Sequence, residues 1–210
     1  MGVSQGNILS PILYSLKINN IVKSVLKGLE ASLFVDDFAL CIRAKFRPHA
    51  HRFMQDWVSK NGFKFSTSKT VCKHFCNQRK HFAEPSTLLD KTPIKVVTEA
   101  KFFGVIFDRT LSHSSHVKYL KTNCPKVLDI LKVVGHTDWG ADQKPLLCFY
   151  RAHVRSKSDY GCIVYGAASN NILKEQDPIH HQRLRIALGA FRSSPVTSLY
   201  AKAKEISSFF

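Results

Sequence analysis

The sequence predicts an α+β protein, with helices packed on an antiparallel sheet in residues 1–110 and a helical region in residues 111–210. Two strand-like runs, 31–35 and 38–42, flank a pair of adjacent carboxylates, and further short aromatic and β-branched runs follow. Beyond residue 110 the apolar residues instead recur at steps of three and four, the spacing of one helix face. The change in pattern predicts a domain boundary near residue 110.

The first expected element is a helix with Ser10 as its N-cap and Pro11 at its first helical position. Its apolar residues keep helical spacing as far as Leu29. They are Ile18, Ile21, Val22, Val25 and Leu29. A hairpin should follow with Asp36 and Asp37 at its tip, because Asp is depleted from strands and common in turns.

A second helix should open near Pro48 and stop at Asn61-Gly62. Its apolar residues fall on one face, and they are Ala50, Phe53, Met54, Trp57 and Val58. The remaining elements expected before residue 110 are short strands at 63–65 and 70–75, a polar loop at 77–92, and a strand pair formed by 94–97 and 102–107.

The second region carries a long helical stripe made of Val117, Leu120, Cys124, Val127, Leu131 and Val134. Pro125 should bend or interrupt this helix, because proline removes a backbone donor and crowds the preceding turn. Two further helices are expected, at 146–154 and at 184–188.

The chain is strongly basic, with a formal net charge of +16 and a pI of about 9.8 over 210 residues. Residues 1–110 hold 17 Lys and Arg against 8 Asp and Glu, and residues 111–210 hold 14 against 7. The excess is therefore spread over both regions rather than confined to a tail. This charge is typical of a protein that lies along a phosphate backbone.

The composition excludes several other classes of protein. No apolar run approaches the roughly 20 residues of a membrane-spanning helix, and residues 1–20 lack the pattern of a signal peptide. The 6 cysteines are scattered without a paired framework, which favours reduced thiols. We expect an intracellular protein without a membrane partner, and the sequence does not distinguish nucleus from cytoplasm.

Asp36 and Asp37 invite two interpretations. Adjacent like charges on a tight turn repel each other unless a cation lies between them, and Mg²⁺ commonly takes one or two protein carboxylates together with substrate phosphates. The alternative is an exposed turn that uses Asp because Asp tolerates turn geometry. Taken alone, the pair does not decide between the two.

Four segments in register give the pair its context: 2–13, 31–43, 61–70 and 101–108. Together they resemble the palm of a reverse transcriptase, most closely the polymerases of non-LTR, LINE-like retrotransposons of the Jockey type. Segments 138–141, 156–162 and 177–181 resemble the region that follows the palm in those elements, so the likeness covers essentially the whole chain. It implies a C-terminal fragment, with a partial palm in 1–110 and a thumb-like region in 111–210.

The resemblance also implies a chemistry, nucleotidyl transfer by two metal ions about 3.5–4 Å apart. Asp36 would be a direct ligand of Mg²⁺ in the intact parent polymerase, and Asp37 would support the same cluster. Lys69 matches the lysine thought to protonate the departing pyrophosphate. The substrates would be an RNA template, a DNA primer and deoxynucleoside triphosphates.

Other matching positions would hold the nucleic acid. Gln5 and Gly6 would stand near the templating base, while Phe102 and Gly104, with Phe103 between them, would grip the primer backbone. Basic residues of the helical region are further candidates for the template–primer backbone. They are Lys118, Lys121, Lys126 and Lys132 on one segment, and Arg151, Arg155 and Lys157 on the next.

The chain departs from the family pattern in one respect that affects activity. Reverse transcriptases need a further carboxylate, carried on a strand that precedes the Gln5-Gly6 motif, and fingers that grip the incoming triphosphate. This sequence starts at that motif, so we expect the 210-residue chain to be inactive by itself. The alternative function is a non-catalytic nucleic-acid-binding protein derived from such an element.

Cysteine and histidine clusters offer a rival interpretation as metal sites. Cys72, His74 and Cys76 with His81 could bind Zn²⁺, but the second ligand pair of the usual structural site is missing. His180 and His181 are adjacent, and adjacent helical residues point about 100° apart. Packing or nucleic-acid roles are therefore favoured for these two.

Overall fold

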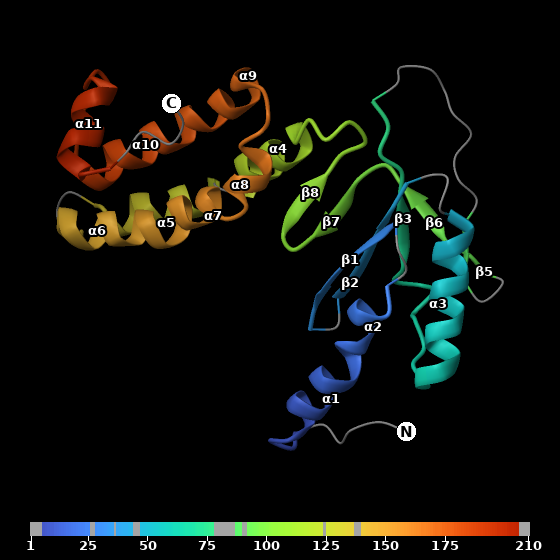
Figure 1. The fold of residues 1–210 in the computed structure, drawn as a ribbon. Helices are drawn as coiled ribbons and strands as arrows, with labels where there is room; N and C mark the ends of the chain where they lie inside the picture. Colours follow the sequence, from blue (N-terminus) through green and yellow to red (C-terminus); the bar gives the residue numbers. More distant parts are fainter. Residues whose placement is uncertain are drawn as a thin grey trace. The chain divides into compact units, whose positions relative to one another are not determined.

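The computed structural model describes residues 6–25, 28–35, 37–43, 47–77, 87–89, 92–123, 125–136 and 140–205, with the side chains of 47–51 and 125–126 excepted. These residues form helices and four two-stranded sheets (Figure 1), which fits the expected α+β class. The chain divides into two compact units, residues 1–72 with 83–96 and residues 73–82 with 97–210. The palm and thumb-like boundary near residue 110 stays a prediction.

The first unit begins with two short helices, α1 (Ser10–Ile18) and α2 (Asn20–Lys23). The expected N-cap is wrong by one residue: Leu9 occupies that position, and the Asn7 side chain accepts its N–H at 3.0 Å. The expected helical run to Leu29 is also wrong. α2 ends at Lys23, and Leu29 begins a strand after Gly28, which adopts φ +94°.

A hairpin and a long helix complete the core of this unit. β1 (Leu29–Phe34) pairs antiparallel with β2 (Asp37–Ile42), in a register that runs from Leu29 opposite Ile42 to Phe34 opposite Asp37. α3 (Arg47–Asn61) confirms the second expected helix, and it ends before Gly62 at φ +69°. Its apolar face packs into a cluster whose buried members are Ile21, Leu29, Phe53 and Trp57.

The aromatic run after α3 is not a strand, contrary to expectation. Phe63 stacks on Trp57 with ring centroids 5.2 Å apart, and Phe65 lies 6.3 Å from the same indole. These rings therefore alternate because they fill the core beneath α3, and their backbone forms no ladder.

Three further strand pairs follow. β3 (Val71–Lys73) pairs with β6 (Lys95–Val97), β4 (Leu88–Leu89) with β5 (Thr92–Pro93), and β7 (Ala100–Phe102) with β8 (Val105–Phe107). The expected pairing of 94–97 with 102–107 is thus wrong, because 100–107 folds back on itself. The expected loop at 77–92 contains β4 and the start of β5, while 78–86 and 90–91 lie outside the described residues.

One carboxylate organises the connection from β8 to the helical part. Asp108 accepts hydrogen bonds from the Ser112 hydroxyl at 2.8 Å, from the backbone N–H of Ser112 at 3.1 Å and of His113 at 2.8 Å, and from the Thr110 hydroxyl at 2.9 Å. Although partial burial raises its pKa, these donors hold the pKa of Asp108 well below the usual value. The connection leads directly into α4 (Ser114–Asn123).

Helices make up the rest of the second unit (Figure 1). After α4 come α5 (Pro125–Val134), α6 (Gln143–Tyr150), a π-helical turn (Arg151–Arg155), α7 (Ser156–Asp159), α8 (Cys162–Tyr165), α9 (Asn170–Leu173), a 3₁₀ turn (Lys174–Gln176), α10 (Asp177–Leu188) and α11 (Val196–Ala203). Pro125 opens α5, which confirms that it interrupts the stripe; Cys124 lies outside the described residues. The helices expected at 146–154 and 184–188 are confirmed within longer elements.

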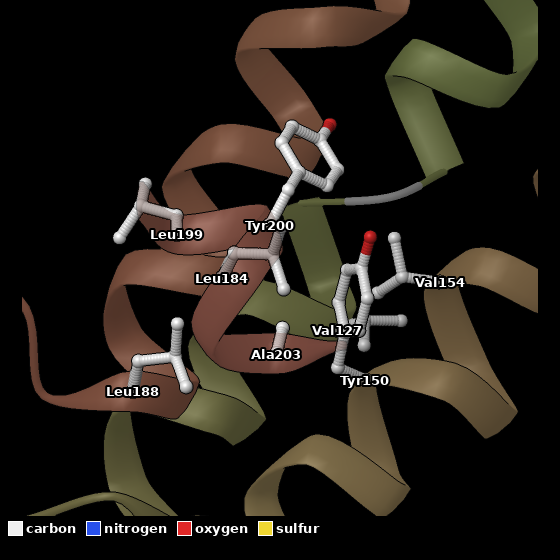
Figure 2. Close-up of a cluster of buried hydrophobic side chains, with 8 residues drawn as sticks. All are labelled: Val127, Tyr150, Val154, Leu184, Leu188, Leu199, Tyr200 and Ala203. Carbon is white, nitrogen blue, oxygen red and sulfur yellow. The ribbon is translucent and has the colours of Figure 1, made fainter. Parts of the chain in front are cut away.

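Figure 2 shows the main core of this unit, where α10 and α11 meet α5, α6 and the π-helical turn. Its buried members are Val127, Tyr150, Val154, Leu184, Leu188, Leu199, Tyr200 and Ala203. A chain of polar groups runs beside these apolar side chains. Tyr150 Oη lies 2.8 Å from His180 Nδ1, and His180 Nε2 lies 3.1 Å from Ser158 Oγ.

His180 therefore has a packing role, one of the two roles expected for it. It is buried, and burial lowers its pKa from 6.5 to about 4, with the positive charges of Arg183 and Arg155 adding to the effect. The unfolded chain takes up this proton at a higher pH than the folded chain does. The stabilisation is therefore complete above about pH 6.5 and is lost as the pH falls toward 4.

We expect the free energy of unfolding to fall by about 3 kcal/mol between pH 7 and pH 4 through His180. Urea unfolding at a series of pH values measures this. His180→Gln should be less stable at pH 7 but should lose most of that pH dependence. A wild-type stability that stays flat between pH 6.5 and 4 would contradict the prediction.

Candidate functional site

The tip of the β1–β2 hairpin is a two-residue loop, Val35-Asp36, between the paired residues Phe34 and Asp37. The expected hairpin is thus confirmed. Asp37 is the first residue of β2 and is exposed to solvent. Asp36 lies outside the described residues, as does Gln5.

Val35 adopts an unusual backbone conformation in this loop, with φ +55°. A left-handed residue costs roughly 1–2 kcal/mol when it carries a side chain, and a β-branched one is rare there. Val35 is also 65% exposed, so little burial compensates the strain. Strain of this kind occurs preferentially at functional sites.

Asp37 offers hard oxygen ligands at an open surface, the donor chemistry that Mg²⁺ prefers. Such a carboxylate fits an ion that takes its other ligands from substrate phosphates. Within the described ranges, no three His, Cys, Asp or Glu side chains lie close enough to hold a metal ion. His81, the fourth member of the candidate zinc cluster, is not among those residues, and Cys72 Sγ accepts a hydrogen bond from Thr87 Oγ1 at 3.6 Å.

Two other predicted site residues lie in the same unit as the hairpin. Gly6 is exposed at φ +88°, and a Cβ built on it would meet no atom within 4 Å. Lys69 is exposed in a turn closed by Thr70, whose N–H and hydroxyl bind the Ser66 carbonyl at 2.9 and 2.7 Å. In the part of the chain that is described, no hydrogen bond or ion pair joins Gly6 or Lys69 to Asp37.

Phe102 and Gly104 belong to the second unit, at the tip of the β7–β8 hairpin. The two-residue loop here is Phe103-Gly104, with φ +47° and +76°. The Phe102 and Phe103 rings stack with centroids 3.8 Å apart. Tyr160, which sequence reasoning did not single out, donates its hydroxyl to the Phe103 carbonyl at 2.8 Å.

Of the three basic residues expected to face nucleic acid on the second segment, Arg151 and Arg155 form ion pairs and Lys157 does not, among the described residues. Arg151 Nε lies 2.6 Å from Glu205 Oε1, and Arg155 pairs with the other oxygen of the same carboxylate. Arg155 Nε also lies 3.3 Å from Asp159. Lys157 is exposed, and no ion pair involves it among the described residues. Glu205 is 50 residues from Arg155 in sequence, so no local pattern could have revealed this pairing.

Comparison with known protein families identifies the family of this chain. The family model for reverse transcriptase (RNA-dependent DNA polymerase) matches residues 1–121. The chain belongs to the reverse transcriptase family. The match contains the β1–β2 and β7–β8 hairpins, which carry the candidate carboxylates and the candidate primer-binding residues.

Two curated relatives of this reverse transcriptase chain support the likeness to LINE-like elements. It is 24% identical over 204 residues to the "Probable RNA-directed DNA polymerase from transposon X-element" of Drosophila melanogaster, covering 90% of this chain and 22% of that protein. It is 26% identical over 151 residues to the "Retrovirus-related Pol polyprotein from type-1 retrotransposable element R1 2" of Nasonia vitripennis, covering 66% of this chain and 37% of that protein. The chain thus spans less than two fifths of either relative.

No solved structure matches this reverse transcriptase chain. Among its described residues, no helix has both the length and the apolarity needed to cross a membrane.

The backbone strain at Val35 in the β1–β2 loop of this reverse transcriptase chain can be relieved by substitution. Val35→Asn should raise the free energy of unfolding by about 0.5–1 kcal/mol, because Asn tolerates the left-handed conformation and Val35 buries little surface. Urea unfolding measures the change. Val133→Asn is the matched control: Val133 is similarly exposed on α5, and Val and Asn have similar helix propensities, so stability should barely change. A clear loss of stability in Val35→Asn would contradict the strain.

Proposed function

We propose that this chain is part of the palm and the thumb-like region of an RNA-directed DNA polymerase of a LINE-like mobile element, which copies an RNA template from a DNA primer. The observation that carries the proposal is the two-residue β1–β2 loop with Asp37 exposed at its end, inside the region that matches the family. The likeness of the two curated relatives, both from transposable elements, supports the same assignment.

In the parent polymerase, the residues of this chain would have separate roles in metal binding, proton transfer and template binding. Asp36 and Asp37 would hold Mg²⁺, which supplies charge stabilisation to the reacting phosphate when it is bound. Lys69 would give a proton to the leaving pyrophosphate; its exposed position in a turn leaves it free to reach a substrate. Gln5 and Gly6 would contact the templating base, where the absence of a Cβ allows close approach.

The 210-residue chain alone is proposed to be inactive in nucleotidyl transfer. Two carboxylates on one tight turn seldom hold two metal ions in working geometry, and a two-metal site needs ligands for both ions. The described residues offer no cluster of three metal-ligating side chains beside Asp37.

The purified chain should therefore extend a DNA primer on an RNA template no faster than its Asp36→Ala, Asp37→Ala double variant. Extension is measured by gel electrophoresis of a labelled primer with Mg²⁺. A polypeptide that also carries the family's upstream carboxylate strand and fingers should extend the primer, and the same double substitution should abolish that activity. Robust Mg²⁺-dependent extension by the 210-residue wild type, lost in the double variant, would overturn the proposed inactivity.

The charge distribution favours a second candidate, a non-catalytic nucleic-acid-binding protein derived from such an element. The net charge of +16 is spread over both halves of the sequence and does not depend on the catalytic carboxylates. Binding of this kind is sequence-independent and weakens by roughly 0.9 log unit per neutralised phosphate for each decade of salt on a duplex.

We expect the chain to bind a template–primer duplex with steep salt dependence, as measured by fluorescence anisotropy between roughly 50 and 200 mM salt. Replacing Asp36 and Asp37 by Ala should leave the affinity unchanged or slightly raised, because negative charge is removed from a phosphate-facing surface. Replacing Arg151, Arg155 and Lys157 together should weaken binding and flatten the salt slope.

The triple substitution also breaks the ion pairs of Glu205, so Lys157→Glu is the cleaner variant. It should weaken binding without loss of fold, because Lys157 is exposed. Lys202→Glu, the same charge change on an exposed position of α11, is the control and should have the smaller effect. A salt-insensitive complex would contradict the phosphate-binding proposal.

A further inference from the structure

The β7–β8 hairpin reverses direction through a loop that one of its residues does not favour. A tight two-residue hairpin loop needs positive φ, which Gly104 adopts freely at +76°. Phe103 has φ +47°, a conformation that residues with a side chain rarely adopt. Such a backbone persists only where neighbouring groups hold it.

Tyr160, at the end of α7, is the neighbour that holds this loop. Its hydroxyl donates to the Phe103 carbonyl at 2.8 Å, so it fixes the peptide unit between the two loop residues. Its ring covers Gly104: a Cβ built there would lie 2.9 Å from Tyr160 Cε1, closer than real Cβ atoms approach. A side chain at position 104 would therefore have to push the ring aside, and the positive φ disfavours it as well.

The neighbouring residues extend the attachment. Gly161 has φ +75°, and a Cβ built on it would lie 2.7 Å from a methyl group of Val105. From α4, the buried His116 accepts the backbone N–H of Ile106 through Nδ1 at 3.3 Å. The hairpin is therefore held at its loop by Tyr160 and along β8 by Gly161 and His116, all within the second unit.

We propose that Tyr160 is a positioning residue for primer binding: it fixes the β7–β8 loop in the conformation in which Phe102 and Gly104 meet the primer backbone. This inference rests on the proposed function of those two residues. Tyr160 acts through the loop, because its hydroxyl is occupied by the Phe103 carbonyl. A looser loop would populate the binding-competent conformation less, and the apparent affinity would fall by that fraction.

The test compares the wild-type chain with Tyr160→Phe, which removes only the hydroxyl, and with Tyr119→Phe. Tyr119 is the matched control, since its hydroxyl contacts the side chain of Lys101 at 3.2 Å and no backbone group of the loop. Two quantities are measured: hydrogen–deuterium exchange of residues 100–107 in the free protein, and affinity for a template–primer duplex.

Tyr160→Phe should speed exchange in the loop by about five- to tenfold, the effect of one neutral hydrogen bond, while global unfolding changes little. Its affinity for the duplex should fall by about two- to fivefold. Tyr119→Phe should change neither quantity. In the wild type, bound duplex should slow exchange in residues 100–107.

The outcomes separate the inference from the proposed function. A wild type that binds no duplex, or whose loop is not protected by the duplex, would overturn the primer-binding function, while exchange in the free protein would still measure the hold of Tyr160 on the loop. Faster exchange with unchanged affinity in Tyr160→Phe would overturn the positioning role and leave a purely structural contact. Wild-type exchange in Tyr160→Phe would overturn the inference at its first step.

Discussion

The requirement that a two-residue hairpin loop adopt left-handed backbone conformations governs both candidate functional hairpins. In the β1–β2 hairpin the requirement falls on Val35, and in the β7–β8 hairpin on Phe103 and Gly104. Asp37, the strand residue that follows the first loop, and Gly104, within the second loop, are both exposed. Glycine meets the requirement at one of these positions only; at the others the chain accepts strain in exchange for a fixed presentation.

Burial of polar groups is the corresponding constraint in the helical part. Tyr150, His180 and Ser158 satisfy one another across three helical segments, and the Tyr165 hydroxyl donates to the Ser158 carbonyl. Because each group would be costly to bury alone, the network specifies how α6, α7, α8 and α10 are arranged. The apolar cluster of Figure 2 shares α6 and α10 with this network, so packing and polar satisfaction act on the same two helices.

Local signals predicted the elements whose causes are local. The hairpin around Asp37, the helix ending at Asn61 and the break at Pro125 each follow from turn residues, a cap or proline. The spacing of Leu29 fits a helix, but α2 ends at Lys23 and Leu29 is the first residue of β1. Phe63 and Phe65 alternate like the residues of a strand, yet both pack in the core around Trp57.

Contacts between distant residues could not be predicted in this way. The pairing of Arg151 and Arg155 with Glu205 depends on residues far apart in sequence, so charge counting alone treats both as free cations. Among the candidate site residues, the motifs located the hairpin loops but gave no sign of the contact between Tyr160 and Phe103.

The π-helical turn Arg151–Arg155 makes the helical part tolerant of a change in chain length at one place. A π-turn accommodates one more residue than an α-helical turn, and each residue of an α-helix advances the side chains by about 100°. Losing a single residue here would let α6 run on as a regular helix, and the later side chains of that run would keep their orientation. Ser158 would still face His180, and Tyr160 would still face the loop it holds. A one-residue deletion in related chains should therefore be tolerated better within these five residues than in the regular turns of α6, where it would rotate every later side chain by about 100°.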